Sequence, residues 1–166
     1  MQNKIAMLVL LALSISLSGA VKEKSTSQSV EINAPASKVW PVLVDADHWV
    51  DDNPAVKQSK LISGDGEKAG SLIEYTPVVG KVSPVKLKVT LTVSEKNQKL
   101  EYVADQPGVK MVMGFELTEK NGVTTLTNYE RASGFIPQAV SQANMDEEHR
   151  LWAKAVKNRV ENPKGK

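Results

Sequence analysis

Cysteine is absent from this chain of 166 residues, and histidine occurs only twice. The absence of cysteine excludes disulfides, a thiol nucleophile and thiolate metal sites. In an oxidising compartment, stability would therefore depend on core packing alone. The sequence also lacks a phosphate-binding loop, a dinucleotide fingerprint and a Gly-x-Ser-x-Gly turn. We accordingly predict no cofactor and no metal site from motifs.

An excess of charge of one sign is also missing. Lysine and arginine number 21 against 19 aspartates and glutamates, so the formal net charge is +2. This balance gives no broad attraction for nucleic acid, and we expect no nucleic-acid partner. The apolar content of 41% and charged content of 24% are typical of one soluble globular domain.

The first twenty residues have the three-part pattern of a secretory signal. A short polar start with one cation precedes an uncharged apolar run at residues 5–17, and small residues end the segment at Ser18 and Ala20. The run is shorter than the roughly 20 residues of a membrane span. We predict cleavage before Val21 and export to the periplasm or the medium. An uncleaved N-terminal anchor is the alternative.

The remaining chain divides into a polar, flexible lead-in at residues 21–27, one domain at residues 28–162, and a loose tail at residues 163–166. Within the domain, alternating apolar residues and turn signals predict an antiparallel sheet. Asn121-Gly122 favours a tight hairpin turn, because both positions tolerate positive φ. The seven predicted strands are residues 29–33, 57–62, 71–76, 85–93, 99–104, 109–117 and 123–131.

Two helical regions complete the predicted domain. A short helix follows Pro35, and residues 45–49 close it. A helix of about 25 residues starts after the break at residues 134–137 and ends near Asn162-Pro163. Its apolar stripe requires a partner surface, and only the sheet can supply one. The stripe contains Val140, Met145, Leu151, Trp152, Ala155 and Val156.

Polar residues interrupt the apolar stripe, notably Asn144, Glu148 and Arg159. A buried carboxylate without a partner would be costly. In one interpretation, Glu148 pairs with Arg159 or a strand residue, or reaches water. In the other, the stripe faces a cavity, and Asn144 and Glu148 contact a ligand. His149 falls at the stripe's edge, and we expect it to be half-exposed. A catalytic pair with Glu148 is disfavoured, because adjacent helical residues point about 100° apart.

The element order and the opening at residues 30–40 (VEINAPASKVW) carry a resemblance. The chain resembles the helix-grip proteins of the START/Bet v 1-like superfamily (SRPBCC), in particular its polyketide cyclase/dehydrase and lipid-transport group, over residues 28–161. The resemblance implies an α+β helix-grip fold. In this fold, a curved antiparallel sheet of about seven strands wraps around the long C-terminal helix, and two short helices follow the first strand. It further implies an apolar cavity between sheet and helix.

Ligand contacts are predicted for residues that the resemblance places around this cavity. Strand tyrosines could orient a ligand, and methionines offer an adaptable apolar wall. The candidates are Asn144, Glu148, Trp152, Tyr75, Tyr102, Tyr129, Met111, Met113 and Trp49. Glu148 and His48 are weak candidates for acid–base catalysis. The acids around His48 match no metal loop, so we interpret them as a solvated helix end.

We predict an exported carrier or sensor of a hydrophobic small molecule, such as a lipid, sterol, quinone or polyketide-like compound. Export favours binding or transport over catalysis, because most cyclases of this group work inside the cell. One alternative is a cyclase/dehydratase-like enzyme, and another is a protein-interaction module without a ligand. We expect a monomer or a weak dimer, and the sequence allows transient contact with a membrane.

Overall fold

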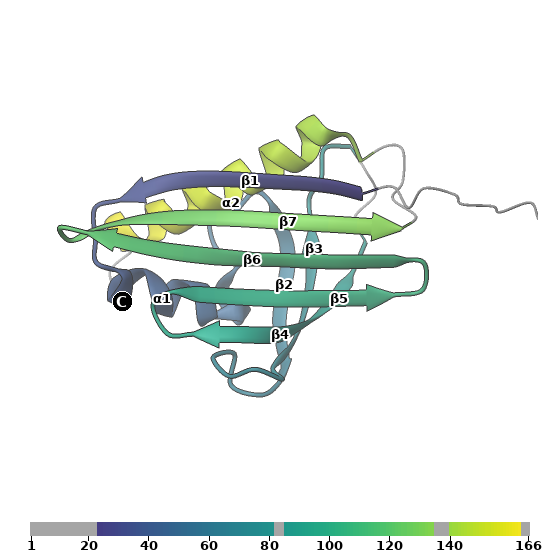
Figure 1. Ribbon diagram of the computed structural model, residues 1–166, viewed down its shortest axis with the longest axis horizontal. Helices are drawn as coiled ribbons and strands as arrows, with labels where there is room; N and C mark the ends of the chain where they lie inside the picture. Colours follow the sequence, from purple (N-terminus) through teal and green to yellow (C-terminus); the bar gives the residue numbers. More distant parts are fainter. Residues whose placement is uncertain (1–22, 82–84, 135–139, 164–166) are drawn as a thin grey trace, which may run out of the picture.

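The computed structural model describes residues 23–81, 85–134 and 140–163. It contains the expected curved antiparallel sheet, which packs against a long C-terminal helix (Figure 1). The predicted signal at residues 1–20 and the last residues of the predicted tail lie outside the described residues. The seven strands are β1 (Glu23–Ile32), β2 (Val56–Ser63), β3 (Leu72–Pro77), β4 (Leu87–Glu95), β5 (Lys99–Gln106), β6 (Val109–Lys120) and β7 (Val123–Gly134).

The strand order is β1-β7-β6-β5-β4-β3-β2, and every neighbouring pair is antiparallel. Five of the six pairs join strands that are consecutive in the sequence. The sixth pair joins β1, at one edge of the sheet, to β7. The turn between β6 and β7 confirms the prediction, because Asn121 (φ 54°) and Gly122 (φ 76°) both have positive φ. In Figure 1, β2 and β3 run across the direction of the other strands, which gives the sheet its curvature.

Strand β1 begins at Glu23, within the segment that the sequence predicted to be a flexible lead-in. Polar groups of this edge strand, both side chain and backbone, hydrogen-bond to residues of the C-terminal helix. The Thr26 hydroxyl donates a hydrogen bond to the carboxylate of Asp146 at 2.6 Å. The side-chain amide of Gln142 donates one to the backbone carbonyl of Ser25 at 2.8 Å. The backbone of β1 pairs with β7 from Glu23 onward. Composition alone therefore misjudged this segment.

The helices confirm the expected types but not all of the expected lengths. Helix α1 (Ala36–Val44) and the short 3-10 helix η1 (Ala46–His48) form the predicted pair after the first strand. Helix α2 (Gln142–Glu161) has 20 residues, so it is shorter than the predicted 25. Its N-cap is Ser141, whose side chain accepts a hydrogen bond from the backbone N–H of Asn144. Strand β7 occupies the chain up to Gly134.

Helix α2 packs mainly along β1 and also contacts β7 and α1. The layer between α2 and the sheet is the core, and it includes the inward side chains of the central strands. The largest of the fully buried side chains is Trp49, just after η1. Among the described residues, no helix combines the length and hydropathy that a bilayer span requires.

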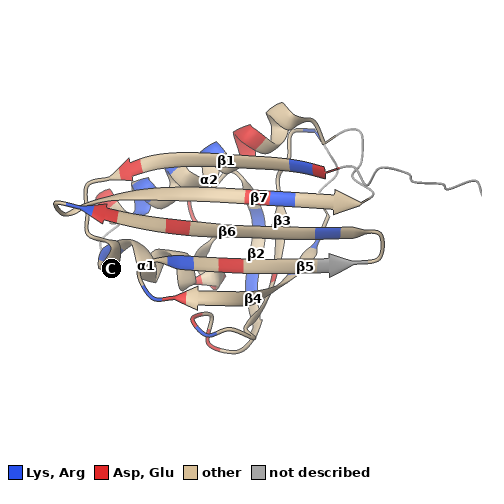
Figure 2. Cartoon of the chain, viewed as in Figure 1, with Lys and Arg blue, Asp and Glu red and all other residues tan. Residues whose placement is uncertain are grey.

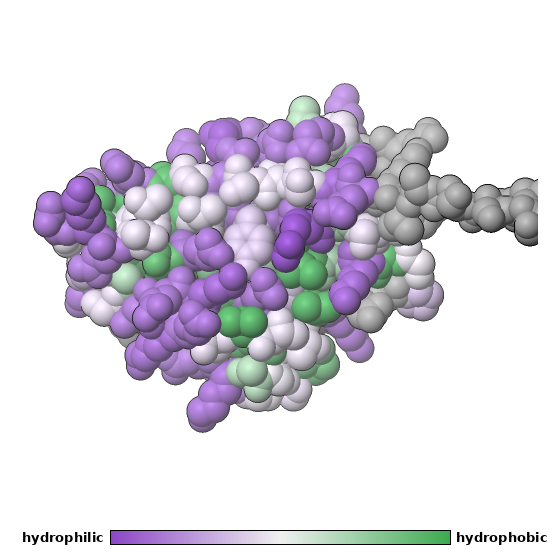
Figure 3. Space-filling view, viewed as in Figure 1, coloured by the Kyte–Doolittle hydropathy of each residue, from purple (hydrophilic) through white to green (hydrophobic). Residues whose placement is uncertain are grey.

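Charged residues of both signs are spread over the strands (Figure 2). The outward face is correspondingly a mixture of hydrophilic and hydrophobic residues (Figure 3). Strand charges of opposite sign also pair across the sheet, as Lys99 of β5 does with Glu116 of β6 at 3.0 Å. This mixed surface agrees with the small net charge of the sequence.

Replacing Trp49 with alanine should destabilise the fold strongly, because it leaves a large cavity in the core. Trp49 is 1% exposed, and its indole N–H donates to the carbonyl of Leu43 at 2.8 Å. We expect the free energy of unfolding to fall by about 3–5 kcal/mol in urea denaturation. Val85→Ala is the control, because Val85 is 57% exposed and its loss should change stability by less than about 0.5 kcal/mol. A loss below about 1 kcal/mol for W49A would contradict this view of the core.

Candidate functional site

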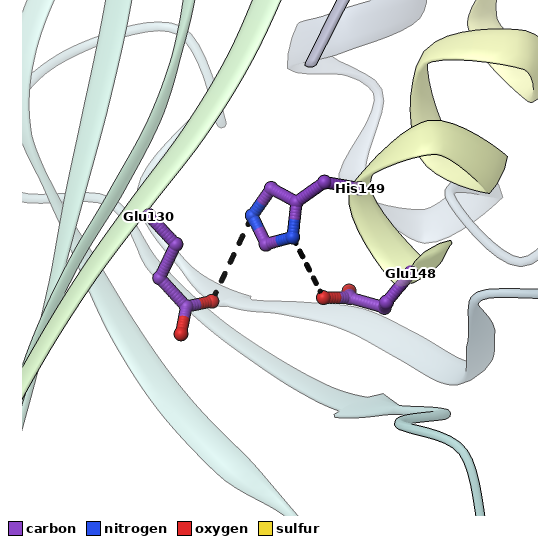
Figure 4. A group of neighbouring side chains, drawn as sticks. All are labelled: Glu130, Glu148 and His149. Atoms are coloured by element: carbon purple, nitrogen blue, oxygen red, sulfur yellow. Dashed lines mark ion pairs between the residues drawn. The ribbon is translucent and has the colours of Figure 1, made fainter. Parts of the chain in front are cut away.

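Three titratable side chains lie buried between the sheet and α2. Glu148 and His149 come from α2 and are 5% and 2% exposed, and Glu130 comes from β7 and is 8% exposed. Figure 4 shows the His149 ring between the two carboxylates. We call these three residues the Glu–His–Glu cluster. Burying any one of these groups alone in an apolar interior would cost free energy of folding. A buried cluster of three titratable groups is also a candidate functional site.

The ring of His149 uses its two nitrogens differently. Nδ1 lies 3.0 Å from Oε2 of Glu148 and 3.1 Å from the backbone carbonyl of Met145. A carbonyl can only accept, so Nδ1 carries a proton and donates to these oxygens. On the other side of the ring, Nε2 faces Oε2 of Glu130 at 3.8 Å. At this distance the two groups form an ion pair, but they are too far apart for a hydrogen bond.

The pairing of Glu148 with His149 corrects two expectations. We predicted that the histidine would be half-exposed and that neighbouring helical residues would point too far apart to interact. Burial of both residues under the sheet turns their side chains into the same space, and the flexible glutamate reaches Nδ1 of the ring. Helical angles describe where side chains start, whereas rotamers decide where a long side chain ends.

Electrostatics in the cluster follow from burial and from the short distances. Burial raises the pKa of Glu130 to about 7; the charge of Glu148 also raises it, and His149 opposes the shift. Burial lowers the pKa of His149, but the hydrogen bond to Glu148 and the two carboxylate charges outweigh it, so the net shift is upward. Burial, followed by the charges of Glu130 and Glu148, raises the pKa of Tyr75 well above its usual value.

An aromatic cluster forms the apolar part of the same interior. Trp49 lies at its centre and makes edge-on contacts with Tyr75, Tyr102 and Trp152, with ring centroids 5.4–6.1 Å apart. Phe115 extends the cluster through a 5.4 Å contact with Trp152. The Tyr75 hydroxyl donates to Sδ of Met113 at 3.1 Å. Elements from both ends of the chain therefore converge on one aromatic interior.

Two polar atoms in this aromatic cluster are buried without a hydrogen-bond partner among the described residues. They are the hydroxyl of Tyr102 and the indole Nε1 of Trp152. Most buried polar groups in native proteins are paired, and leaving one unpaired costs about 1–3 kcal/mol. Both rings contact Trp49, so the two orphan groups belong to the same region. Both groups are therefore free to hydrogen-bond a further polar group.

A pocket of about 320 Å³ lies beside the edge strand β2. Its lining includes Val50, Lys86 and the register partners Ser59 and Tyr75. The hydroxyl of Ser59 is likewise buried, and no group in the described part of the chain hydrogen-bonds to it. Tyr75 lines this pocket and also contacts Trp49. The pocket therefore adjoins the aromatic cluster.

The structure brings together most of the residues that the sequence proposed for ligand contact. Tyr75, Tyr102, Met113, Trp152 and Glu148 are all buried in the interior, and Met111 packs half-buried at its edge. Trp49, another of the candidates for ligand contact, lies at the centre of the aromatic cluster.

Other proposed residues lie elsewhere. Tyr129 is on the outer face of β7, where its hydroxyl donates to Glu101 at 2.9 Å, because the alternation of the strand points its neighbour Glu130 inward. Asn144 is half-buried in the first turn of α2 and lies against Gly80. His48 is exposed and bonds Asp45 at 2.7 Å, so it takes no part in the buried cluster.

Of the alternatives considered for Glu148, a pairing with Arg159 does not occur. Arg159 instead donates to the carbonyl of His48 at 2.7 Å and pairs with Asp45 at 3.7 Å. The two residues are eleven positions apart, which is three turns along α2, so one lies under the sheet and the other reaches η1. The partner of Glu148 is its chain neighbour.

Sequence reasoning missed Glu130, although a usable signal was present. The buried residues of β7 alternate as Thr124, Leu126, Asn128, Glu130 and Ala132. Leu126 identifies this row as the inward face, and the same period places Glu130 inside. The period that predicts this strand therefore also predicts a carboxylate on its inward face.

Comparison with known proteins agrees with this architecture. The profile of the family described as "Polyketide cyclase / dehydrase and lipid transport" matches residues 23–164. The abscisic acid receptor PYL2 of Arabidopsis thaliana is 34% identical over 99 residues, which cover 60% of this chain and 44% of the receptor. The chain thus spans less than half of this curated relative.

Solved structures with the same fold include two bacterial proteins. A START superfamily protein from Mycobacterium smegmatis has a TM-score of 0.69 at 17% identity, with 84% of this chain and 99% of that chain covered. The Zhui aromatase/cyclase from Streptomyces sp. R1128 has a TM-score of 0.66 at 14% identity, with 84% and 94% covered. At these identities the likeness concerns the fold alone.

Replacing Tyr102 with phenylalanine should stabilise the ligand-free protein. The change removes a buried hydroxyl without a partner, and we expect the free energy of unfolding to rise by about 1–3 kcal/mol. Tyr75→Phe is the matched control, since that hydroxyl is equally buried but donates to Met113. It should leave stability unchanged or lower it. If urea denaturation shows Y102F to be destabilised as well, the hydroxyl is not an orphan group.

Proposed function

The chain belongs to the polyketide cyclase/dehydrase and lipid-transport family of the START/Bet v 1-like superfamily, and we propose that it is an exported carrier or sensor of a hydrophobic small molecule that bears an oxygen. The ligand lies between the sheet and α2, against the aromatic cluster. The two orphan donors, the Tyr102 hydroxyl and the Trp152 indole N–H, carry this proposal.

The chemistry of these groups favours a particular kind of ligand. An indole N–H can only donate, and a phenol hydroxyl donates readily. Both donors therefore suit a carbonyl or hydroxyl oxygen of the ligand. The surrounding rings of Trp49, Tyr75 and Phe115 favour a flat apolar body. Quinones and polyketide-like compounds combine both features.

Burial of the ligand's apolar surface supplies the affinity, at roughly 25 cal/mol per Å² before ordering costs. The orphan donors supply orientation, since each gains its missing hydrogen bond only in the complex. Family membership supports a binding function of this kind, because the abscisic acid receptor PYL2 is a relative of the chain.

The alternative of a protein-interaction module has less support. Such a module would present an exposed apolar patch. Among the residues that the structure describes, the exposed large apolar side chains are Ile62 and Val85. They lie at the end of β2 and just before β4 and do not amount to such a surface.

A matched pair of probes tests the role of the oxygen. We expect 2-methyl-1,4-naphthoquinone to bind at least about tenfold more tightly than 2-methylnaphthalene, which corresponds to one hydrogen bond or more. Isothermal calorimetry on the purified chain measures both affinities. The quinone is a suitable probe here, because the chain has no cysteine thiol with which it could react.

Variants of the two orphan donors test whether these groups bind the oxygen of the quinone. Y102F and W152F should each lower the affinity for the quinone by about tenfold and leave the affinity for the hydrocarbon nearly unchanged. Y129F is the matched control, since Tyr129 lies on the outer face. Equal affinities of the two probes in the wild-type chain would reject recognition by the orphan donors. If neither probe binds and native mass spectrometry gives a clean ligand-free mass, the result would count against binding of this ligand class.

Export is a separate part of the proposal, supported by the pattern of residues 1–20. Expression of the full chain in a bacterium should give a protein in the periplasm or medium whose intact mass begins at Val21. Replacing two leucines of the apolar run by arginine should retain the full-length chain in the cytoplasm. A full-length mass in the membrane fraction of the unmodified chain would instead indicate an uncleaved anchor.

A further inference from the structure

The Glu–His–Glu cluster has a second feature that ligand binding at the aromatic cluster leaves unexplained. The carboxylate of Glu130 makes no hydrogen bond to any of the described residues, and its single ion pair with His149 is 3.8 Å long. Its side chain is nevertheless only 10% exposed. A buried carboxylate in this position normally has closer partners.

His149 is oriented as metal-binding histidines usually are. Its Nδ1–H is held by the Met145 carbonyl at 3.1 Å and by Glu148 at 3.0 Å. Such hydrogen bonds fix the ring and aim the other nitrogen at a metal. Here Nε2 is aimed at Glu130 (Figure 4).

The distances also suit a bound ion. Nitrogen and oxygen ligands lie about 2.0–2.2 Å from Zn²⁺, so two of them are about 3.4 Å apart at a tetrahedral angle and farther apart at wider angles. The separation of Nε2 and Oε2 of Glu130 is 3.8 Å. One donor atom from each of Glu130, Glu148 and His149 lies within 4.8 Å of the other two.

We propose that the Glu–His–Glu cluster binds a divalent transition-metal ion of the Zn²⁺ type, with Nε2 of His149 and the carboxylate of Glu130 as ligands. Glu148 is a positioning residue that holds the imidazole through Nδ1. Two carboxylates balance the charge of a divalent ion, and a mixed imidazole and carboxylate set suits zinc or a similar metal better than calcium or magnesium. Remaining coordination positions are available to water or to an oxygen of a bound molecule. This inference does not depend on the proposed carrier function.

Histidine NMR provides a direct test on the wild-type chain. The chain has only two histidines, His48 and His149, so H48Q assigns the ring signals without ambiguity. After dialysis against a chelator, titration with Zn²⁺ should shift the Nε2 resonance of His149 at one equivalent and leave Nδ1 protonated. Calorimetry on the same samples should give one site per chain.

Variants separate ligands from the positioning residue. We expect E130Q and H149Q to lower Zn²⁺ affinity by at least about 100-fold, and E148Q by about 10-fold, as for outer hydrogen-bond partners of metal ligands. H48Q is the control and should bind as the wild type does. Circular dichroism and thermal melts verify that each variant is folded, and E130D offers a second substitution that keeps the charge if E130Q does not fold.

Two results would overturn the proposal. One is the absence of any shift of His149 at millimolar Zn²⁺ in the folded wild-type chain. The other is a shift confined to His48, which would show loose binding at the exposed Asp45–His48 pair. Neither result would affect the probe experiment on Tyr102 and Trp152, so failure of the metal site and failure of the carrier function can be distinguished.

Discussion

The packing of α2 against the curved sheet is the constraint on which the rest of the structure depends. The buried face of this helix carries Trp152 and Val156, but it also carries Glu148 and His149. Covering such a face requires an interior that is apolar in one part and charged in another. The sheet meets both needs, since β6 contributes Phe115 and Met113 and β7 contributes Glu130.

The two parts of the interior differ in how well their polar groups are paired. In the charged part, His149 connects two carboxylates, and only the contact with Glu130 is long. In the aromatic part, the hydroxyl of Tyr102 and the indole N–H of Trp152 have no hydrogen-bond partner within the described ranges of the chain. Unpaired buried donors reduce stability, and the proposed ligand would supply the hydrogen bonds that these two groups lack.

Sequence periodicity predicted the fold well where the chain alternates regularly. The strands from β4 to β7 and their hairpins were expected, and Asn121-Gly122 forms the predicted turn. The prediction failed where partners distant in sequence decide the structure. Strand β1 begins as early as Glu23 because its polar side chains form hydrogen bonds with α2, as Thr26 does with Asp146. A polar segment without periodicity gives no local sign of such partners.

For the site, the sequence determined the kinds of side chain present: no thiol, two histidines, and aromatic residues on strands and helix. It also determined that Glu148 interrupts an apolar stripe. Only the tertiary structure decided that His149, and not Arg159, is the partner of Glu148. It alone placed Glu130 beside them and turned Tyr129 outward. Periodicity fixes the face on which a side chain begins, but contacts between distant elements and the rotamers they select fix which atoms meet.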